Sequence, residues 1–148
     1  MIPIGHVETP WATVADCPRN GRKPEHPPLC HAVIRPEFIA GLASLEGFSH
    51  LILVTLLDEA PEPRLVFIPP FDSHPRGVFA TRAPWRPNPI GVTVVALEGV
   101  EGPGRLAIRY MDCRNGTPIL DIKPYLRTVD SVQDSRMGWL EPNVKAEG

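Results

Sequence analysis

The sequence predicts a small, mainly β protein, either a barrel or a sandwich, with one short helix and proline-rich loops. Three observations indicate this class. The apolar segments are short, and they either alternate with polar residues or run continuously, as buried strands do. Turn residues separate these segments about every ten positions. Apolar residues recur at helical spacing in one stretch, residues 36–48.

Seven segments are expected to form strands. The run 50–57 is continuously apolar but too short for a helix, which indicates a buried strand. The sequence Glu-Gly-Pro-Gly at 101–104 predicts a hairpin between the segments beside it. The expected strands cover residues 2–9, 31–36, 50–57, 64–69, 92–100, 105–112 and 118–126, the last of which is interrupted at Pro124.

The other segments are expected to form loops and one helix. Residues 11–30 carry four prolines and an Asn20-Gly21 turn, which predicts a long loop. Pro36 suits the first turn of a helix. The apolar residues that then follow at helical spacing are Phe38, Ile39, Leu42 and Leu45.

Length and composition limit the class of protein. A chain of 148 residues, 43% hydrophobic and 22% charged, is typical of a globular protein. We expect one domain over residues 1–130 and a polar tail over 131–148. No apolar run approaches the ~18 residues of a membrane span, and no signal peptide is visible. Three cysteines argue against a disulfide framework and indicate the cytoplasm.

The net charge of −2 conceals an uneven distribution. The segments 17–35, 64–91 and 105–127 each carry +3, and the rest of the chain is acidic. Charge fluctuates along any chain, but proline and glycine are also concentrated in the first two of these segments. This favours the interpretation that the three segments fold together and form a site for an anionic ligand.

Several common sites are missing from the sequence. It has no glycine-rich dinucleotide fingerprint, no Gly-Lys-Ser/Thr phosphate loop, no serine nucleophile elbow and no Cys-x-x-Cys or His-Glu-x-x-His pair. The nearest approach to a metal set is Cys17, His26, Cys30 and His31. Their spacing matches no familiar zinc pattern, so no metal is expected.

The most unusual segment is GVFATRAPWRPNPIG at 77–91, with three prolines between positions 84 and 89. Each proline fixes φ and removes a backbone donor, so neither a helix nor a strand tolerates this run. Such a loop is stiff before a ligand binds, because it has little conformational entropy left to lose. It is predicted to be a preformed wall of a binding site.

Three segments resemble the signature segments of the TrmO family, also called the TsaA or YaeB-like family: LEGFSHL at 45–51, GVFATRAPWRPNPIG at 77–91 and GTPILDIKPY at 116–125. The opening IGHVETPW and the turn PRNG are similar to the family's first strand and turn. The resemblance covers roughly residues 2–130. It implies a small β-barrel that works as a homodimer. It also implies an enzyme that uses S-adenosyl-L-methionine to methylate N6 of threonylcarbamoyl-adenosine at position 37, in the anticodon loop of tRNA.

The resemblance also implies which residues contact the cofactor. Its carboxylate suits an arginine, its ammonium suits oxygen atoms, and its adenine suits an apolar slot. Val92 would line that slot or be a core residue, and the turn 116–118 would bind the cofactor or be a plain turn. Arg82 is expected at the end of an apolar strand, where an unpaired charge is costly. The implied contacts are Arg19, Asn20, Arg82, Val92, Gly116, Thr117 and Pro118.

RNA contacts and a catalytic candidate complete the predicted site. Asp121 would steady the sulfonium, receive the N6 proton or pair with an arginine of the signature segments. The residues assigned to the RNA face are Arg86, Asn88, Lys123 and Tyr125. Its arginine and lysine would contact phosphate and its tyrosine would stack on a base; the alternative is that all four are solvated loop residues.

The chain departs from the family pattern in two ways. Family members usually carry aromatic residues after GFSH and a histidine at the end of that strand, whereas here Asp58 stands at the histidine position. A carboxylate there would suit the cofactor ammonium. The chain is also expected to lack the C-terminal domain of longer members. Two other interpretations stay open: a non-catalytic RNA-binding barrel, and a methylase of another nucleoside or a small molecule.

Overall fold

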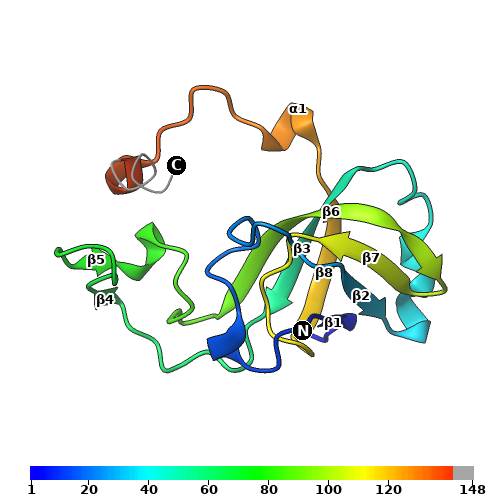
Figure 1. Ribbon diagram of the computed structural model, residues 1–148, viewed down its shortest axis with the longest axis horizontal. Coiled ribbons are helices and arrows are strands. Elements are labelled where there is room, and N and C mark those ends of the chain that lie inside the picture. The colour runs from blue at the N-terminus through cyan, green and yellow to red at the C-terminus, as the bar shows by residue number, and fades with distance from the viewer. Residues whose placement is uncertain (142–148) are drawn as a thin grey trace.

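The computed structural model describes residues 1–141 and confirms the mainly β class as a closed six-stranded barrel (Figure 1). The strands pair antiparallel in the order β1-β2-β7-β6-β3-β8, and β8 closes on β1. The barrel, not the sandwich, is therefore the fold. Its strands are β1 (Gly5–Glu8), β2 (Cys30–Ile34), β3 (His50–Leu56), β6 (Ile90–Gly102), β7 (Arg105–Arg109) and β8 (Pro118–Pro124).

The barrel is filled by alternate residues of its strands. On β3, Leu51, Leu53 and Thr55 are fully buried, and the residues between them are partly exposed. Burial of each large apolar side chain stabilises the fold by about 1.5–3 kcal/mol. Closure depends on Gly5, which pairs with both neighbours of β1. A β-carbon there would overlap the carbonyl oxygen of Val33, so the strands can approach only at a glycine.

The helix predicted over 36–48 is shorter and of another kind. It is a 3₁₀ helix, η2 (Pro36–Leu42), with Pro36 in its first turn as expected. Ala43 leaves helical backbone angles and Ser44 has φ of 71°, so the helix cannot continue. The predicted apolar face is correct in part, because Phe38, Leu42 and Leu45 pack against the core.

The strand predicted over 64–69 does not join the barrel. Its only extended part is β4 (Val66–Phe67), which pairs with β5 (Arg76–Gly77). Together with η3 (Val78–Ala80), these strands form a separate unit beside the barrel, residues 64–86, called the lobe below (Figure 1). Prolines at 63, 69, 70 and 75 keep its strands short, because proline cannot donate to a strand ladder.

Two further segments lie outside the barrel strands and the lobe. The loop between β1 and β2 contains η1 (Val14–Asp16). After β8, the chain forms α1 (Arg127–Asp130), runs back to the lobe and ends the described part at η4 (Gly138–Leu140) (Figure 1). No helix in the described part of the chain is long and apolar enough to cross a membrane.

The predicted polar tail contains a tryptophan, Trp139, that contacts the lobe. Trp139 Nε1 donates a hydrogen bond of 2.8 Å to the carbonyl oxygen of Ala80, and its ring stacks on Phe71 with centroids 5.8 Å apart. The tail is therefore fastened to the lobe at this point. The part of the tail prediction that concerns residues 142–148 lies outside the described residues.

Candidate ligand-binding pocket

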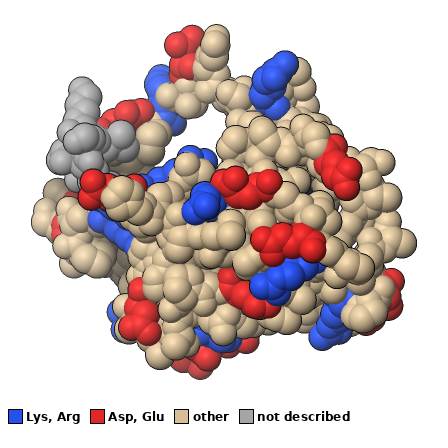
Figure 2. All heavy atoms as spheres, turned by 45° about the vertical axis from the view of Figure 1, so that its right-hand side comes forward, with Lys and Arg blue, Asp and Glu red and all other residues tan. Residues whose placement is uncertain are grey.

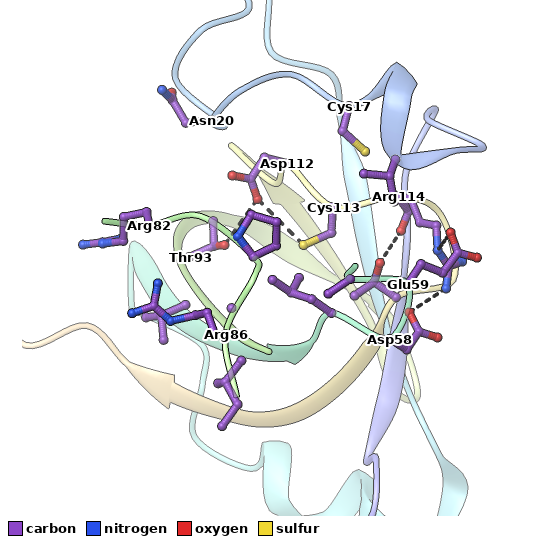
Figure 3. A pocket seen from close by; sticks show the side chains of 18 of the residues that line it. Cys17, Asn20, Asp58, Glu59, Arg82, Arg86, Thr93, Asp112, Cys113 and Arg114 are labelled. Atoms are coloured by element: carbon purple, nitrogen blue, oxygen red, sulfur yellow. Dashed lines mark hydrogen bonds and ion pairs between the residues drawn. The ribbon is translucent and has the colours of Figure 1, made fainter. Parts of the chain in front are cut away.

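Four segments far apart in the sequence form a pocket of about 730 Å³ (Figure 3). This volume falls within the ~300–1,000 Å³ of small-molecule sites. The lining residues lie in the ranges 14–20, 57–61, 82–93 and 112–117. They come from the β1–β2 loop, the end of β3, the proline-rich loop with the start of β6, and the β7–β8 connection.

The three positive segments do contribute to one site. Arg19, Arg82, Arg86 and Arg114 line the pocket, and each of the three segments supplies at least one of them. Acidic residues line it as well, so the pocket is not uniformly positive. The outer surface shown in Figure 2 has the same mixed character, with basic and acidic side chains interspersed.

The proline-rich loop forms one wall of this pocket. Arg86, predicted to contact RNA, donates from Nη1 to the carbonyl oxygens of Thr81 at 2.9 Å and Ala83 at 3.1 Å. These two bonds hold the loop in shape, because they satisfy carbonyl groups that no regular element pairs. Arg86 thus has a structural task in the loop, although its side chain also lines the pocket.

Arg82 was predicted at the end of an apolar strand, and this prediction is wrong. It lies two residues after η3 and is exposed. It makes no direct hydrogen bond or ion pair within residues 1–141. Its charge acts on Asp112, which also lines the pocket. The guanidinium of Arg82 can therefore bind a ligand without breaking an internal bond.

The carboxylate that stands in place of the expected histidine already has a partner. Asp58 Oδ1 lies 2.7 Å from Nη2 of Arg114, and Glu59 Oε2 lies 3.0 Å from its Nε (Figure 3). The same guanidinium donates to the carbonyl oxygen of Asn115 at 2.7 Å. Arg114 thus ties the end of β3 to the β7–β8 connection. Asp58 is paired within the chain, although it was expected to face a cofactor ammonium.

Asp112 is a pocket residue that the sequence analysis missed. It follows β7 and accepts hydrogen bonds from Thr93 Oγ1 at 3.4 Å and Cys113 Sγ at 3.8 Å. Burial raises the pKa of its carboxyl group above the usual range. The available signal was a carboxylate between two apolar residues, Met111 and Cys113, at the end of a strand.

Two cysteine thiols also line the pocket, Cys17 and Cys113. Burial raises the pKa of Cys113 to about 12. It also raises the pKa of Cys17, with a further contribution from the charge of Asp112. Both thiols therefore stay protonated at neutral pH, and neither is an activated nucleophile.

The other predicted cofactor positions divide into two groups. Asn20 and Val92 line the pocket, and Val92 is 53% exposed, so the alternative of a core residue is wrong. Thr117 also lines it, and its hydroxyl donates to the carbonyl oxygen of Arg114 at 2.7 Å. Gly116 and Pro118 flank Thr117 without lining the pocket.

The remaining predicted site residues lie elsewhere. Asn88 lines a smaller hollow of about 180 Å³. Asp121 Oδ2 pairs with Lys123 Nζ at 2.9 Å, and Tyr125 packs edge-on against His50 with ring centroids 6.2 Å apart. None of these residues lines the larger pocket, so the structure does not bring Asp121 to it.

No metal centre is visible among residues 1–141: no group of three or more His, Cys, Asp or Glu side chains is placed to hold an ion. Cys30 of the sequence-based candidate set is buried in the barrel core.

Comparison with known proteins gives this pocket its context. Residues 6–131 match the model of the tRNA-methyltransferase O N-terminal domain. The chain belongs to the TrmO family. This confirms the resemblance carried by the signature segments.

Two curated relatives and one solved structure support membership of the TrmO family. A protein of Archaeoglobus fulgidus named as an S-adenosyl-L-methionine-binding protein is 40% identical over 132 residues, which cover 89% of this chain and 93% of the relative. A probable S-adenosyl-L-methionine-binding protein of the same organism is 42% identical over 93% of this chain but only 37% of its own length. The crystal structure of TrmO from Pseudomonas aeruginosa superposes with a TM-score of 0.72 at 36% identity and covers 93% of this chain and 60% of that one. The chain thus spans only part of the longer TrmO proteins.

Proposed function

We propose that the pocket binds S-adenosyl-L-methionine and that the chain is an S-adenosyl-L-methionine-dependent methyltransferase. The observation that carries this proposal is the pocket itself. It gathers Arg19, Asn20, Arg82, Val92 and Thr117, which the family resemblance implied as cofactor contacts, from distant parts of the chain. The domain that matches residues 6–131 is named for a tRNA methyltransferase, and two relatives are named for binding this compound.

The donor set of the pocket fits that cofactor. Arg82 has a guanidinium available for its carboxylate, and Asp112 has a carboxylate available for a cationic group. Leu57, Ile90 and Val92 offer apolar surface for adenine. When bound, the cofactor supplies an activated methyl group. The chain's contribution is to orient the reactants, which is worth up to ~7–11 kcal/mol when positioning is ideal.

We further propose that the substrate is tRNA and that the methyl acceptor is N6 of threonylcarbamoyl-adenosine at position 37. The family name supports this substrate. Asn88, Lys123 and Tyr125 are proposed to contact the RNA outside the pocket, and Lys123 is exposed as such a role requires. Arg86 and Asp121 are weaker proposals, because each is bonded within the chain.

Two properties of the whole protein are part of the same proposal. We propose that it acts in the cytoplasm, which its three free cysteines support. We also propose that it works as a homodimer. Support for the dimer comes from the lobe, where Leu65, Val66 and Ile68 are 57–63% exposed.

A methylase of another nucleoside or small molecule is the second candidate function. It is favoured by the mixed charge of the pocket and surface. An RNA substrate would be held largely through phosphate, so its affinity would fall steeply as salt increases. An affinity for tRNA that is weak and independent of salt would favour the small-molecule candidate.

Calorimetric titration with S-adenosyl-L-methionine tests the proposed cofactor site. Arg82→Ala is the informative variant, because Arg82 makes no direct hydrogen bond or ion pair within residues 1–141 whose loss would disturb the fold. We expect the wild type to bind and the variant to lose roughly tenfold or more in affinity, the value of one charge-assisted hydrogen bond. Arg127→Ala, an exposed arginine outside the pocket, is the matched control and should bind like the wild type.

The outcomes distinguish an error in the proposed cofactor from an error in the proposed substrate. If the wild type does not bind S-adenosyl-L-methionine, with or without tRNA, the methyltransferase proposal is wrong and the non-catalytic RNA-binding barrel is favoured. If binding is established, transfer of labelled methyl to tRNA with and without the threonylcarbamoyl modification identifies the acceptor. Label on neither tRNA would contradict the proposed substrate alone.

A further inference from the structure

Asp112 differs from the other two carboxylates of the pocket. Asp58 and Glu59 lie 2.7 and 3.0 Å from nitrogen atoms of Arg114, so both charges are compensated. Asp112 has no direct ion pair within the described chain. Its donors are its own backbone N–H, a hydroxyl at 3.4 Å and a thiol at 3.8 Å; the two side-chain contacts are weak for an ionised group, and none of the three donors carries a charge. The pocket therefore presents one carboxylate that is short of donors.

The surroundings of Asp112 make it a receptor for positive charge. In Figure 3 it lies between Arg82 and Asn20 on one side and the Arg114 cluster on the other. The charged group that acts on it is Arg82, and the thiols of Cys17 and Cys113 beside it are neutral at neutral pH. Burial has removed water from the carboxylate without supplying a full set of donors. A cation that enters the pocket would supply the missing partner.

We propose that Asp112 is the residue by which the pocket distinguishes a ligand with a cationic sulfur from the same ligand with a neutral sulfur. This inference rests on the proposed function. S-adenosyl-L-methionine and S-adenosylhomocysteine share their adenosine and amino-acid groups and differ by one methyl group and the positive charge on sulfur. Arg82, Val92 and Thr117 would meet the same groups in both ligands. Asp112 makes the charged form bind more tightly than the neutral one, which favours release of the neutral form after methyl transfer.

The test compares the affinities of the two ligands by calorimetry, so it does not depend on activity. We expect the wild type to prefer S-adenosyl-L-methionine roughly tenfold, as one charge-assisted contact predicts. In Asp112→Asn, which keeps the size of the side chain, this preference should fall below about threefold through weaker binding of the cationic ligand. Asp134→Asn removes an exposed carboxylate outside the pocket and should keep the wild-type ratio.

The outcomes separate this inference from the proposed function. If the wild type binds neither ligand, the proposed function fails and the inference fails with it. If the wild type binds both without preference, the Asp112 assignment is overturned and the cofactor site stands. The same conclusion follows if Asp112→Asn keeps the wild-type ratio, or if Asp134→Asn loses it.

A measurement on the wild type alone covers the case in which Asp112→Asn does not fold. Because burial raises the carboxyl pKa of Asp112, the preference should be larger at neutral pH than in acid and should narrow as the pH falls through that raised pKa. The thiols of Cys17 and Cys113 stay protonated over this range, because burial raises their pKa as well. A ratio that does not change with pH would overturn the assignment.

Discussion

At the scale of single residues, the buried carboxyl group that suits Asp112 to bind a cation also lowers the stability of the folded state. The pKa of its carboxyl group is raised in the folded state by burial, so ionisation opposes folding at any pH above that raised pKa. The opposition disappears as the pH falls and the carboxyl group becomes protonated. We therefore expect ligand-free Asp112→Asn to melt a few degrees above the wild type at neutral pH. Thermal melts across pH should show this difference shrinking in acid.

A wild type that is as stable as Asp112→Asn at neutral pH would contradict this account of the carboxylate. Sequence patterns could indicate Arg82 and Val92 by resemblance, whereas for Asp112 they offered only a carboxylate between two apolar residues. Its place in the pocket depends on contact with Thr93 of β6, 19 positions away in the sequence, which no local pattern reports. For the same reason the partner of Asp58 was not predictable: Arg114 lies 56 positions away in the sequence.

At the scale of elements, the loop that carries Arg19 and Asn20 packs closely against Tyr110. Gly21 is buried against the carbonyl group of Tyr110, where a β-carbon would overlap the backbone. Arg22 stacks on the ring of Tyr110 at 3.8 Å from its centroid. Tyr110 itself has φ of 72°, in the left-handed region that residues other than glycine rarely adopt.

Gly21→Ala should therefore displace this loop. We expect a loss of about 1–3 kcal/mol in unfolding free energy from the overlap, and weaker binding of S-adenosyl-L-methionine, because Arg19 and Asn20 would move with the loop. Urea denaturation and calorimetry measure the two effects. Gly41→Ala is the control, since nothing lies within 4 Å of a β-carbon there. Equal stability of Gly21→Ala and wild type would mean that the loop is not held by this contact.

The strands of the barrel were predictable because short apolar segments bounded by turn residues leave a local pattern. The continuous apolar run of β3 is one such segment, and its alternate residues from Leu51 through Thr55 are buried in the core. The lobe was predicted wrongly because Leu65, Val66 and Ile68 resemble a buried strand in sequence, yet they are exposed. Local hydrophobicity shows that a segment is apolar, but it does not show what covers it.

At the scale of the whole molecule, these exposed side chains are the best argument for self-association. Large apolar side chains that are exposed close together in a chain often mark an interface. Leu65, Val66 and Ile68 are 62%, 63% and 57% exposed on one short segment, and Phe79 of the same lobe is 74% exposed. The tail covers another part of the lobe, since Trp139 stacks on Phe71. The two-stranded ribbon itself is too small to be stable in isolation, which is a further reason to expect a partner on this surface.

We therefore expect the protein to form a dimer through the lobe. Light scattering on the eluted protein should give about twice the chain mass of 16.3 kDa. Ile68→Glu should shift the mass to that of the monomer, because a buried, unpaired carboxylate at an interface is strongly unfavourable. Val129→Glu is the matched control: Val129 is 69% exposed on α1, outside the lobe, and its substitution should leave the dimer intact. A wild type that elutes as a monomer would contradict the dimer, whereas a dimer that survives Ile68→Glu would place its interface away from the lobe.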